Sequence, residues 1–130
     1  MKFTYFLNEA GKTTVQPKNK VELKKIIEET IKEQGNNCDL NFIDTSKITD
    51  MSELFHNTKF NGDISKWDVS NVENMECMFC NSIFNGDISK WNVSIVINMD
   101  GMFEFSRFNK DISKWDVSYV SNLRDMFYYS

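Results

Sequence analysis

Hydrophobic positions recur along most of this chain at one constant sequence interval. The interval is the number of residues from Trp67 to Trp91, and it is the same from Trp91 to Trp115. The block FNGDISKWDVS at Phe60–Ser70 returns almost unchanged at Phe84–Ser94 and Phe108–Ser118. A fixed period of this size is typical of stacked repeat architectures, so the pattern predicts a solenoid. One repeat cannot bury its tryptophan and phenylalanine alone, whereas stacked repeats form a continuous core. The other apolar positions that carry the period include Met75 and Met99, and Phe55, Phe79, Phe103 and Phe127.

The register of the repeat also extends upstream. Residues 38–55 align with residues 62–79 position by position. We therefore expect about four repeats over residues 37–130, the first degenerate and the last cut off at Ser130. A degenerate first copy is expected because a terminal repeat faces a different neighbour on its outer side. Together with residues 1–36, the repeats are expected to form one cooperative domain.

Within one repeat, the pattern predicts a strand, a turn and a short helix. The stretch I-x-x-W-x-V-x-x-V matches the spacing of the leucine-rich L-x-x-L-x-L-x-x-N pattern. Alternation favours a short strand around Trp67–Val69, and apolar positions at i, i+3 and i+4 favour about one or two helical turns at Asn74–Phe79. Phe84–Asp87 supplies turn residues. The expected fold is an α/β solenoid: a leucine-rich-repeat-like, right-handed stack of strand–turn–short-helix coils.

Polar residues recur at the same period. Carboxylates stacked one strand spacing apart would repel one another, so the simplest explanation is that each aspartate caps backbone N–H groups of its own turn. Asparagines in a column can also hydrogen-bond along it. Calcium is a sharper hypothesis, but one aspartate per repeat at this position supplies few of the roughly six to eight oxygens that calcium requires. The columns are Asn61, Asn85 and Asn109; Asp63, Asp87 and Asp111; and Ser46, Ser70, Ser94 and Ser118.

Residues 1–36 lie outside the repeat and are expected to cap the stack. Phe3–Leu7 is strand-like, Asn8–Gly11 has turn chemistry, and Thr13–Val15 is a second short strand. Residues 20–34 form an amphipathic helix that Asn19 is placed to cap. The apolar positions of this helix are Val21, Leu23, Ile26, Ile27 and Ile31.

Composition narrows the function classes. The chain has 130 residues and a net charge of −4, without a basic stripe, so we expect no nucleic-acid partner. No stretch approaches the length of a membrane span, so we expect no membrane insertion. The apolar run near Met1 is too short for a signal peptide and meets Asn8 and Glu9. The sequence taken alone therefore predicts a cytoplasmic protein.

Candidate chemistry is sparse. Cys77 and Cys80 form a C-x-x-C pair, but the redox version of this motif is expected in a βαβ context, and zinc needs two more ligands. Cys38 and His56 remain as candidates, and His56 lies one repeat before Cys80 in the register. The positions of Cys77 and Cys80 hold different residues in other repeats, so we expect them to be exposed. We therefore predict no metal and no cofactor. We also predict no enzymatic activity, because the single histidine leaves no catalytic triad.

The string F-N-x-D-I-S-x-W-D-V-S-x-V-x-N-M-x-x-M-F, over residues 37–130, resembles the BspA-like leucine-rich-repeat surface proteins. This group is also known as the DUF285 or Mycoplasma lipoprotein-associated repeat. Residues 17–23 and 44–55 look like the family's N-terminal cap. The resemblance implies a protein of host-associated bacteria, displayed at the cell surface or secreted, with a role in adhesion to host matrix proteins. It implies no catalytic residues.

Two functions follow as hypotheses. The first is a bacterial host-interaction or adhesin-like module, and the second is an intracellular bacterial scaffold or inhibitor that binds another bacterial protein. Either would use the solvent-facing side of the stacked strands, unless this side is only a solvated surface. The candidate protein-binding residues are Ser65, Lys66, Asp68, Ser89, Lys90, Asn92, Ser113, Lys114 and Asp116.

The last repeat predicts self-association. The sequence stops just after Met126–Tyr129 with no polar capping repeat. An open solenoid end exposes apolar side chains and unpaired strand edges. We therefore expect a homodimer formed end to end through the C-terminal coil. The residues expected at this contact are Trp115, Phe127, Tyr128 and Tyr129.

Overall fold

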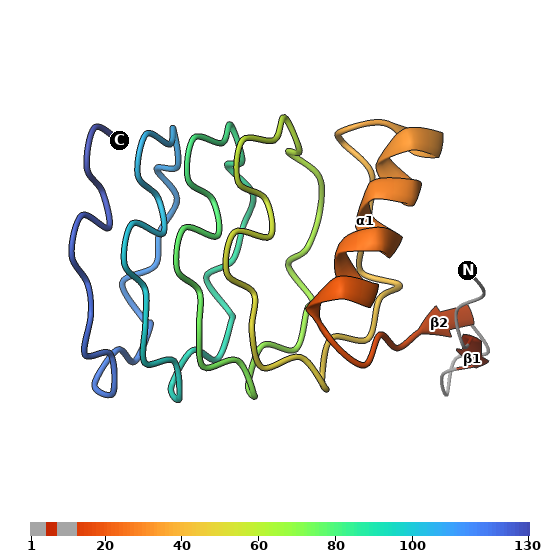
Figure 1. The fold of residues 1–130 in the computed structure, drawn as a ribbon, viewed down its shortest axis with the longest axis horizontal. Coiled ribbons are helices and arrows are strands. Elements are labelled where there is room, and N and C mark those ends of the chain that lie inside the picture. The colour runs from red at the N-terminus through yellow and green to blue at the C-terminus, as the bar shows by residue number, and fades with distance from the viewer. Residues whose placement is uncertain (1–4, 8–12) are drawn as a thin grey trace.

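The structure, a computed structural model, describes residues 5–7 and 13–130. The predicted turn at Asn8–Gly11 and the first two residues of the predicted strand Phe3–Leu7 lie outside this range. Figure 1 shows a row of coils lying side by side, with the C-terminus at one end and helix α1 at the other. The polar and apolar columns of the sequence therefore run along the row, from coil to coil.

The N-terminal elements attach to the first coil through a small hairpin. Strand β1 (Tyr5–Leu7) pairs antiparallel with strand β2 (Thr13–Val15). The Val15 N–H donates to the Phe42 carbonyl oxygen at 3.2 Å, and the Asp44 N–H donates to the Val15 carbonyl oxygen at 2.8 Å. These two bonds make a parallel bridge between Val15 and Ile43. The hairpin is thereby tied to the first coil by main-chain hydrogen bonds.

Helix α1 (Lys20–Gln34) covers the N-terminal end of the row. It begins where the Asn19 side chain accepts the Glu22 N–H at 3.0 Å, and it ends at Gly35, which has φ 90° and donates its N–H to Ile31. These caps explain why the helix occupies the range that its pattern predicts. Val21, which we expected on the apolar face, is 73% exposed. The buried residues are Leu23, Ile26, Ile27 and Thr30.

Successive coils are joined on one side by their main chains. The Met51, Met75 and Met99 N–H groups donate to the carbonyl oxygens of Asn74, Asn98 and Asn122 at 2.8–2.9 Å. Parallel bridges link Asp50, Asn74, Asn98 and Asn122 in one series. We call this the main-chain side; it comprises residues 51–57, 75–81, 99–105 and 123–129.

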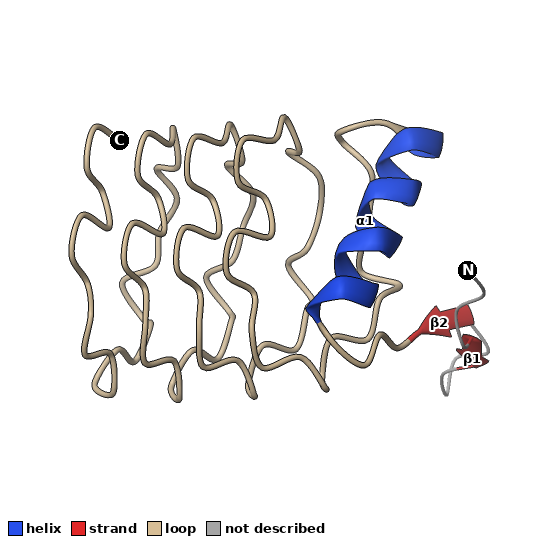
Figure 2. Ribbon diagram, in the orientation of Figure 1, coloured by secondary structure: helices blue, strands red, loops and turns tan. Residues whose placement is uncertain are grey.

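The short helix expected at Asn74–Phe79 does not form. Figure 2 shows no helix in the coils, and this segment is a run of turns. The Cys77 and Phe79 N–H groups donate to Asp100 and Met102 of the next coil, both at 2.9 Å, rather than four residues back within their own segment. Cys77 and Asn81 have φ of 51° and 53°, which no right-handed helix contains. A short helix and a run of turns can both carry apolar residues at i, i+3 and i+4. Hydrogen bonds to the next coil favour the run of turns here.

The strand expected at Trp67–Val69 is also absent from the described residues, where β1 and β2 are the only strands. This side of the coil is linked largely through side chains. The indole Nε1 of Trp91 donates to the Ile64 carbonyl oxygen at 3.1 Å, and that of Trp115 donates to Ile88 at 3.0 Å. We call this the side-chain side; it comprises residues 61–70, 85–94 and 109–118.

The core lies between these two sides and consists of columns of like residues. The Phe55, Phe79 and Phe103 rings stack in series at centroid distances of 5.6 Å, and each is fully buried. Burying a phenylalanine contributes about 1.5–3 kcal/mol, and aromatic pairs add about 0.5–1.5 kcal/mol. Because Phe79 and Phe103 each stack on the matching phenylalanine of both neighbouring coils, the columns stabilise the stack rather than any single coil.

Candidate functional site

The structure brings the predicted protein-binding residues to one surface. Successive members lie one repeat apart on adjacent coils, and every lysine among them is exposed. Ser65 and Ser89 are half-buried and Ser113 is exposed. We call this surface the column face; it comprises Ser65, Lys66, Asp68, Ser89, Lys90, Asn92, Ser113, Lys114 and Asp116.

Exposed aspartates that precede the column-face serines cap their own turns, as the sequence predicts. Asp63 Oδ1 accepts the Ser65 N–H at 2.9 Å and the Ser65 hydroxyl at 2.7 Å. Asp87 holds Ser89 with the same two distances. In the third coil, Asp111 accepts the N–H of the corresponding serine at 2.8 Å. The hydroxyls of Ser65 and Ser89 are thus already donating to an aspartate.

A second set of caps fixes the acidic members of the face. The Ser70 N–H and hydroxyl donate to Asp68 Oδ1 at 3.0 and 2.6 Å. The Ser118 N–H donates to Asp116 Oδ1 at 3.0 Å. A hydrogen bond from the Ser118 side chain and, to a smaller extent, this N–H bond lower the pKa of Asp116. In the corresponding bond of the coil between these two, Asn92 Oδ1 accepts the Ser94 N–H at 3.1 Å, although the Asn92 side chain is uncharged. The backbone turn therefore needs the oxygen atom and not the negative charge.

Hydrogen bonds also keep the other aspartates ionised. The Ser89 and Ser113 side chains and N–H groups lower the pKa of Asp87 and Asp111, with smaller help from lysines. Asn41 and Ser65 lower the pKa of Asp63 in the same way. Asp63, Asp87 and Asp111 therefore carry negative charges at neutral pH next to the serines of the column face to which they bond.

The lysines of the column face, in contrast, are not held by carboxylates. In the described part of the chain, ion pairs join Lys20 to Asp50 at 3.4 Å and Arg124 to Asp100 and Asp125 at 3.3 and 3.9 Å. None of them involves Lys66, Lys90 or Lys114. The long lysine stems leave these ammonium groups free to contact a partner.

The asparagine column hydrogen-bonds along the stack, as predicted. The Asn85 N–H donates to Asn61 Oδ1 at 2.8 Å, and the Asn109 N–H donates to Asn85 Oδ1 at 3.0 Å. Asn85 Nδ2 in turn donates to Asn109 Oδ1 at 3.0 Å. The calcium hypothesis receives no support, because residues 13–130 contain no three-residue ligand cluster that includes the aspartates of this side.

The C-terminal coil exposes aromatic rings, but Trp115 is not one of them. Phe127, Tyr128 and Tyr129 are 50%, 47% and 72% exposed, whereas Trp115 is 9% exposed. The Trp115 indole points back toward Ile88 of the preceding coil, so the preceding coil covers it and our assignment of Trp115 to the exposed end is wrong. The sequence missed Phe105, which is half exposed and stacks on Tyr129 at 5.2 Å.

The C-x-x-C pair meets a carboxylate that the sequence did not single out as a ligand. Ligand atoms of Cys77, Cys80 and Glu104 all lie within 4.8 Å of one another. Cys80 is only 8% exposed, so the prediction of exposed positions is wrong for this residue. Burial raises the pKa of the Cys77 thiol to about 12, with further contributions from Cys80, Glu104 and Glu53. The available signal was the register, because Glu104 lies one repeat after Cys80.

Comparisons place the chain in a family without assigning a function. No curated protein and no solved structure matches it. Across residues 5–7 and 13–130, no helix is both long and apolar enough to cross a membrane. The family described as "Mycoplasma protein of unknown function, DUF285" matches residues 22–130, which include nearly all of α1 and every coil. This chain therefore belongs to the DUF285 family.

Proposed function

We propose that this chain is a non-enzymatic protein-binding module whose contact surface is the column face. The observation that carries the proposal is the repetition of an exposed lysine beside a hydrogen-bonded carboxylate or amide on three adjacent coils. We further propose that the stack is a leucine-rich-repeat-like, right-handed solenoid. Stacked repeats of this kind provide extended binding surfaces, which agrees with a protein-binding function.

The column face suits an extended polypeptide partner of mixed charge. Asp68 and Asp116 are held by local caps, so they lose little further freedom when a partner binds. Lys66 and Lys90 are exposed and have no ion pair among the described residues. Charged rims of this kind set association rate and partner choice more than affinity. We expect a partner whose charges repeat at the spacing of the coils.

The partner is proposed to be a host matrix protein, with a bacterial protein as the alternative. The first follows from the likeness to BspA-like surface proteins, and the second from the expectation of a cytoplasmic protein. Family membership supports neither, because the family's function is unknown. The two proposals differ in where the partner is found, and this can be measured directly.

The test is a parallel capture experiment on extracellular-matrix extract and on bacterial lysate, read by mass spectrometry. The column-face variant is Lys66→Glu, Lys90→Glu and Lys114→Glu. Its matched control is Lys18→Glu, Lys24→Glu and Lys32→Glu, at exposed positions outside the coils. Three reversals of two charges each take both variants from a net charge of −4 to −10. Any difference between the variants then reports position and not total charge.

A matrix protein captured by wild type and by the control, but lost by the column-face variant, supports the adhesin-like function. A bacterial protein with the same pattern supports the scaffold or inhibitor. Equal loss in both variants contradicts the column face as the contact surface. Capture that both variants retain contradicts it as well.

We also propose that the 130-residue chain associates end to end through its last coil. Phe105, Tyr128 and Tyr129 form a cluster of partly exposed rings with centroid distances of 4.2–5.9 Å. Sedimentation equilibrium should show a mass that rises with concentration, and Tyr129→Ser together with Phe127→Ser should abolish the rise. A wild-type chain that stays monomeric at high concentration contradicts this association.

A further inference from the structure

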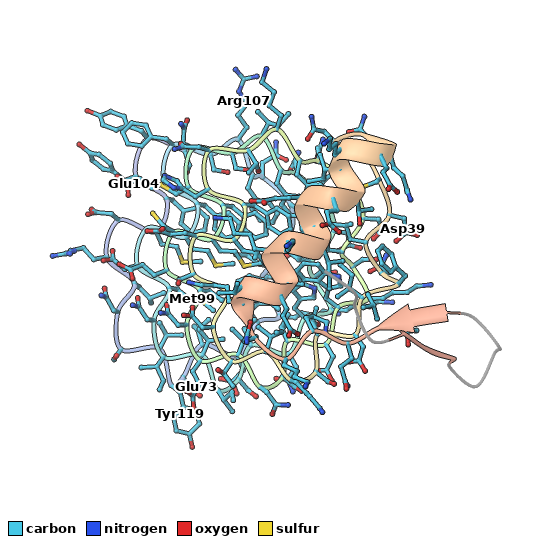
Figure 3. All side chains as sticks on the ribbon, turned by 45° about the vertical axis from the view of Figure 1, so that its right-hand side comes forward. Asp39, Glu73, Met99, Glu104, Arg107 and Tyr119 are labelled. Carbon is cyan, nitrogen blue, oxygen red and sulfur yellow. The ribbon has the colours of Figure 1, made fainter. Side chains whose placement is uncertain are left out.

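Cys77, Cys80 and Glu104 form the one group of three metal-ligating side chains within the described residues. One ligand atom of each lies within 4.8 Å of the other two. Cys77 and Cys80 belong to one run of turns, in which the Cys80 N–H donates to the Cys77 carbonyl oxygen at 3.2 Å. Glu104, labelled in Figure 3, lies one repeat after Cys80, and its carbonyl oxygen accepts the Asn81 N–H at 2.8 Å. Main-chain hydrogen bonds therefore fix the backbone from which all three side chains project.

Gly101 provides the space in which the three ligands meet. It occupies the position of Cys77 in the next repeat, and a Cβ atom there would be 2.9 Å from Glu104 Oε2 and 3.5 Å from Cys77 Sγ. Its φ of 62° does not by itself demand glycine, because Glu53 and Asp125 occupy the same register position at 58° and 54°. Gly101 differs from these residues because it places no side chain between the Cys77 thiol and the Glu104 carboxylate.

The ligand set matches the chemistry of zinc. Two thiols and one carboxylate offer two sulfur atoms and one or two oxygens, and zinc takes such ligands in tetrahedral geometry. Calcium and magnesium prefer all-oxygen sites, and soft sulfur ligands select against them. Zn–S and Zn–O bonds of about 2.3 and 2.1 Å place neighbouring ligand atoms somewhat under 4 Å apart, which falls within the observed 4.8 Å limit.

The local charge favours a cation at this position. Glu53 and Glu104 lie close enough to act electrostatically on Cys77. The nearby Arg124 is paired with Asp100 and Asp125. No ion pair in the described part of the chain neutralises Glu104.

From this geometry we propose that Cys77, Cys80 and Glu104 bind one zinc ion, which joins two adjacent coils. Three protein ligands leave the fourth tetrahedral position to water. His56 lies in the register of Cys80 one coil earlier, and the Asn57 N–H donates to the Cys80 carbonyl oxygen at 3.0 Å. His56 is not among the clustered ligands. Its replacement is therefore expected to leave binding intact.

The first measurement uses the full chain, reduced and stripped of metal with a chelator. Zinc is added in competition with a chromophoric chelator, and cobalt(II) is added in a parallel titration. We expect one equivalent of zinc per chain, and cobalt absorption bands of a tetrahedral site with thiolate-to-metal charge transfer. Absence of zinc binding by the reduced chain overturns the proposal. Cobalt spectra without thiolate charge transfer overturn it as well.

Variants then assign the ligands. Cys77→Ser and Cys80→Ser should each abolish the thiolate bands, and Glu104→Gln should weaken zinc binding by at least about tenfold, since even outer-shell changes cost 10–100-fold. Cys38→Ser is the matched control, because Cys38 is a free buried thiol outside the cluster. If Cys38→Ser weakens zinc as much as Cys77→Ser does, the assignment is wrong.

A further variant separates ligation from folding. Gly101→Asn fills the space between the ligands, and asparagine tolerates positive φ. We expect its metal-free stability to stay near that of wild type while zinc binding falls at least tenfold. Zinc should also raise the unfolding temperature of wild type and not that of Cys77→Ser. If Gly101→Asn binds zinc as wild type does, the proposed site is overturned.

Discussion

From residue 61 onward, the two long sides of each coil are joined to the next coil in different ways. On the main-chain side, N–H groups such as those of Cys77 and Phe79 donate directly to carbonyl oxygens of the following coil. On the side-chain side, Asn85 and the Trp91 indole make the connections between residues 61–70 and 85–94. One side is therefore held whatever its side chains are, whereas the other depends on particular residues.

This difference explains which positions repeat and which vary. Asparagine, aspartate, serine and tryptophan return on the side-chain side because each makes a specific hydrogen bond. On the main-chain side, Glu53, Cys77, Gly101 and Asp125 share one position, and their backbones nevertheless adopt the same positive φ. A cluster of ligands can therefore arise there without loss of the stack. The proposed zinc site lies on this permissive side.

The largest effect is expected from the tryptophan column. Trp91→Ala removes a ring that stacks on Trp67 at 6.5 Å and on Phe79 at 6.4 Å, together with its hydrogen bond to Ile64. Equilibrium urea unfolding should show a loss of about 3–5 kcal/mol. Trp115→Ala, in the last coil, should cost less because Trp115 makes no such ring contact in the described structure. Equal losses would contradict this account of the column.

A smaller loss is expected where a coil turns closely past its neighbour. A Cβ atom on Gly62 would collide with the Cys38 carbonyl oxygen, which accepts the Asp63 N–H at 3.1 Å. Gly62→Ala should therefore cost about 1–3 kcal/mol in urea unfolding. Gly86→Ala is the control, since its nearest backbone atom would be 3.3 Å away. Should Gly86→Ala prove the more damaging, the close approach at Cys38 is not what requires glycine.

The asparagine column should contribute less again. Asn85→Ala removes the acceptor of the Asn109 N–H and the donor to Asn109 Oδ1. We expect a loss of about 1 kcal/mol. Asn92→Ala removes only a cap within its own coil and should cost less than Asn85→Ala in the same unfolding measurement. The opposite order would show that bonds between coils are not what the asparagines supply.

The smallest effect is expected from acid. The folded-state pKa values of Asp63, Asp87, Asp111 and Asp116 are lowered by hydrogen bonds. Their contribution is therefore present above the unfolded-state value of about 3.9 and is lost as pH falls through the folded-state values. Thermal unfolding below about pH 4 should show this loss. Asp87→Asn keeps the oxygen acceptor without the charge and should reduce it, whereas an unchanged acid response would contradict the role of these caps.

Sequence reasoning found the period, the aspartate caps and the asparagine column because each depends on a residue that repeats. It failed at Asn74–Phe79 because the spacing i, i+3, i+4 describes a run of turns as well as a helix. Sequence reasoning also did not predict that Trp115 is buried, because the sequence does not tell which neighbouring coil an indole contacts. Glu104 was missed because its side-chain direction depends on the turns around it.

Amide hydrogen exchange at one register position tests the main-chain side most directly. The N–H groups of Glu53, Cys77 and Gly101 donate to Glu76, Asp100 and Arg124 of the following coils at 2.8–2.9 Å. Although their side chains differ, we predict that all three amides exchange slowly, with protection close to the free energy of global unfolding. Exchange of these amides at the rate of an unstructured chain would contradict the claim that the main chain alone holds this side of the stack.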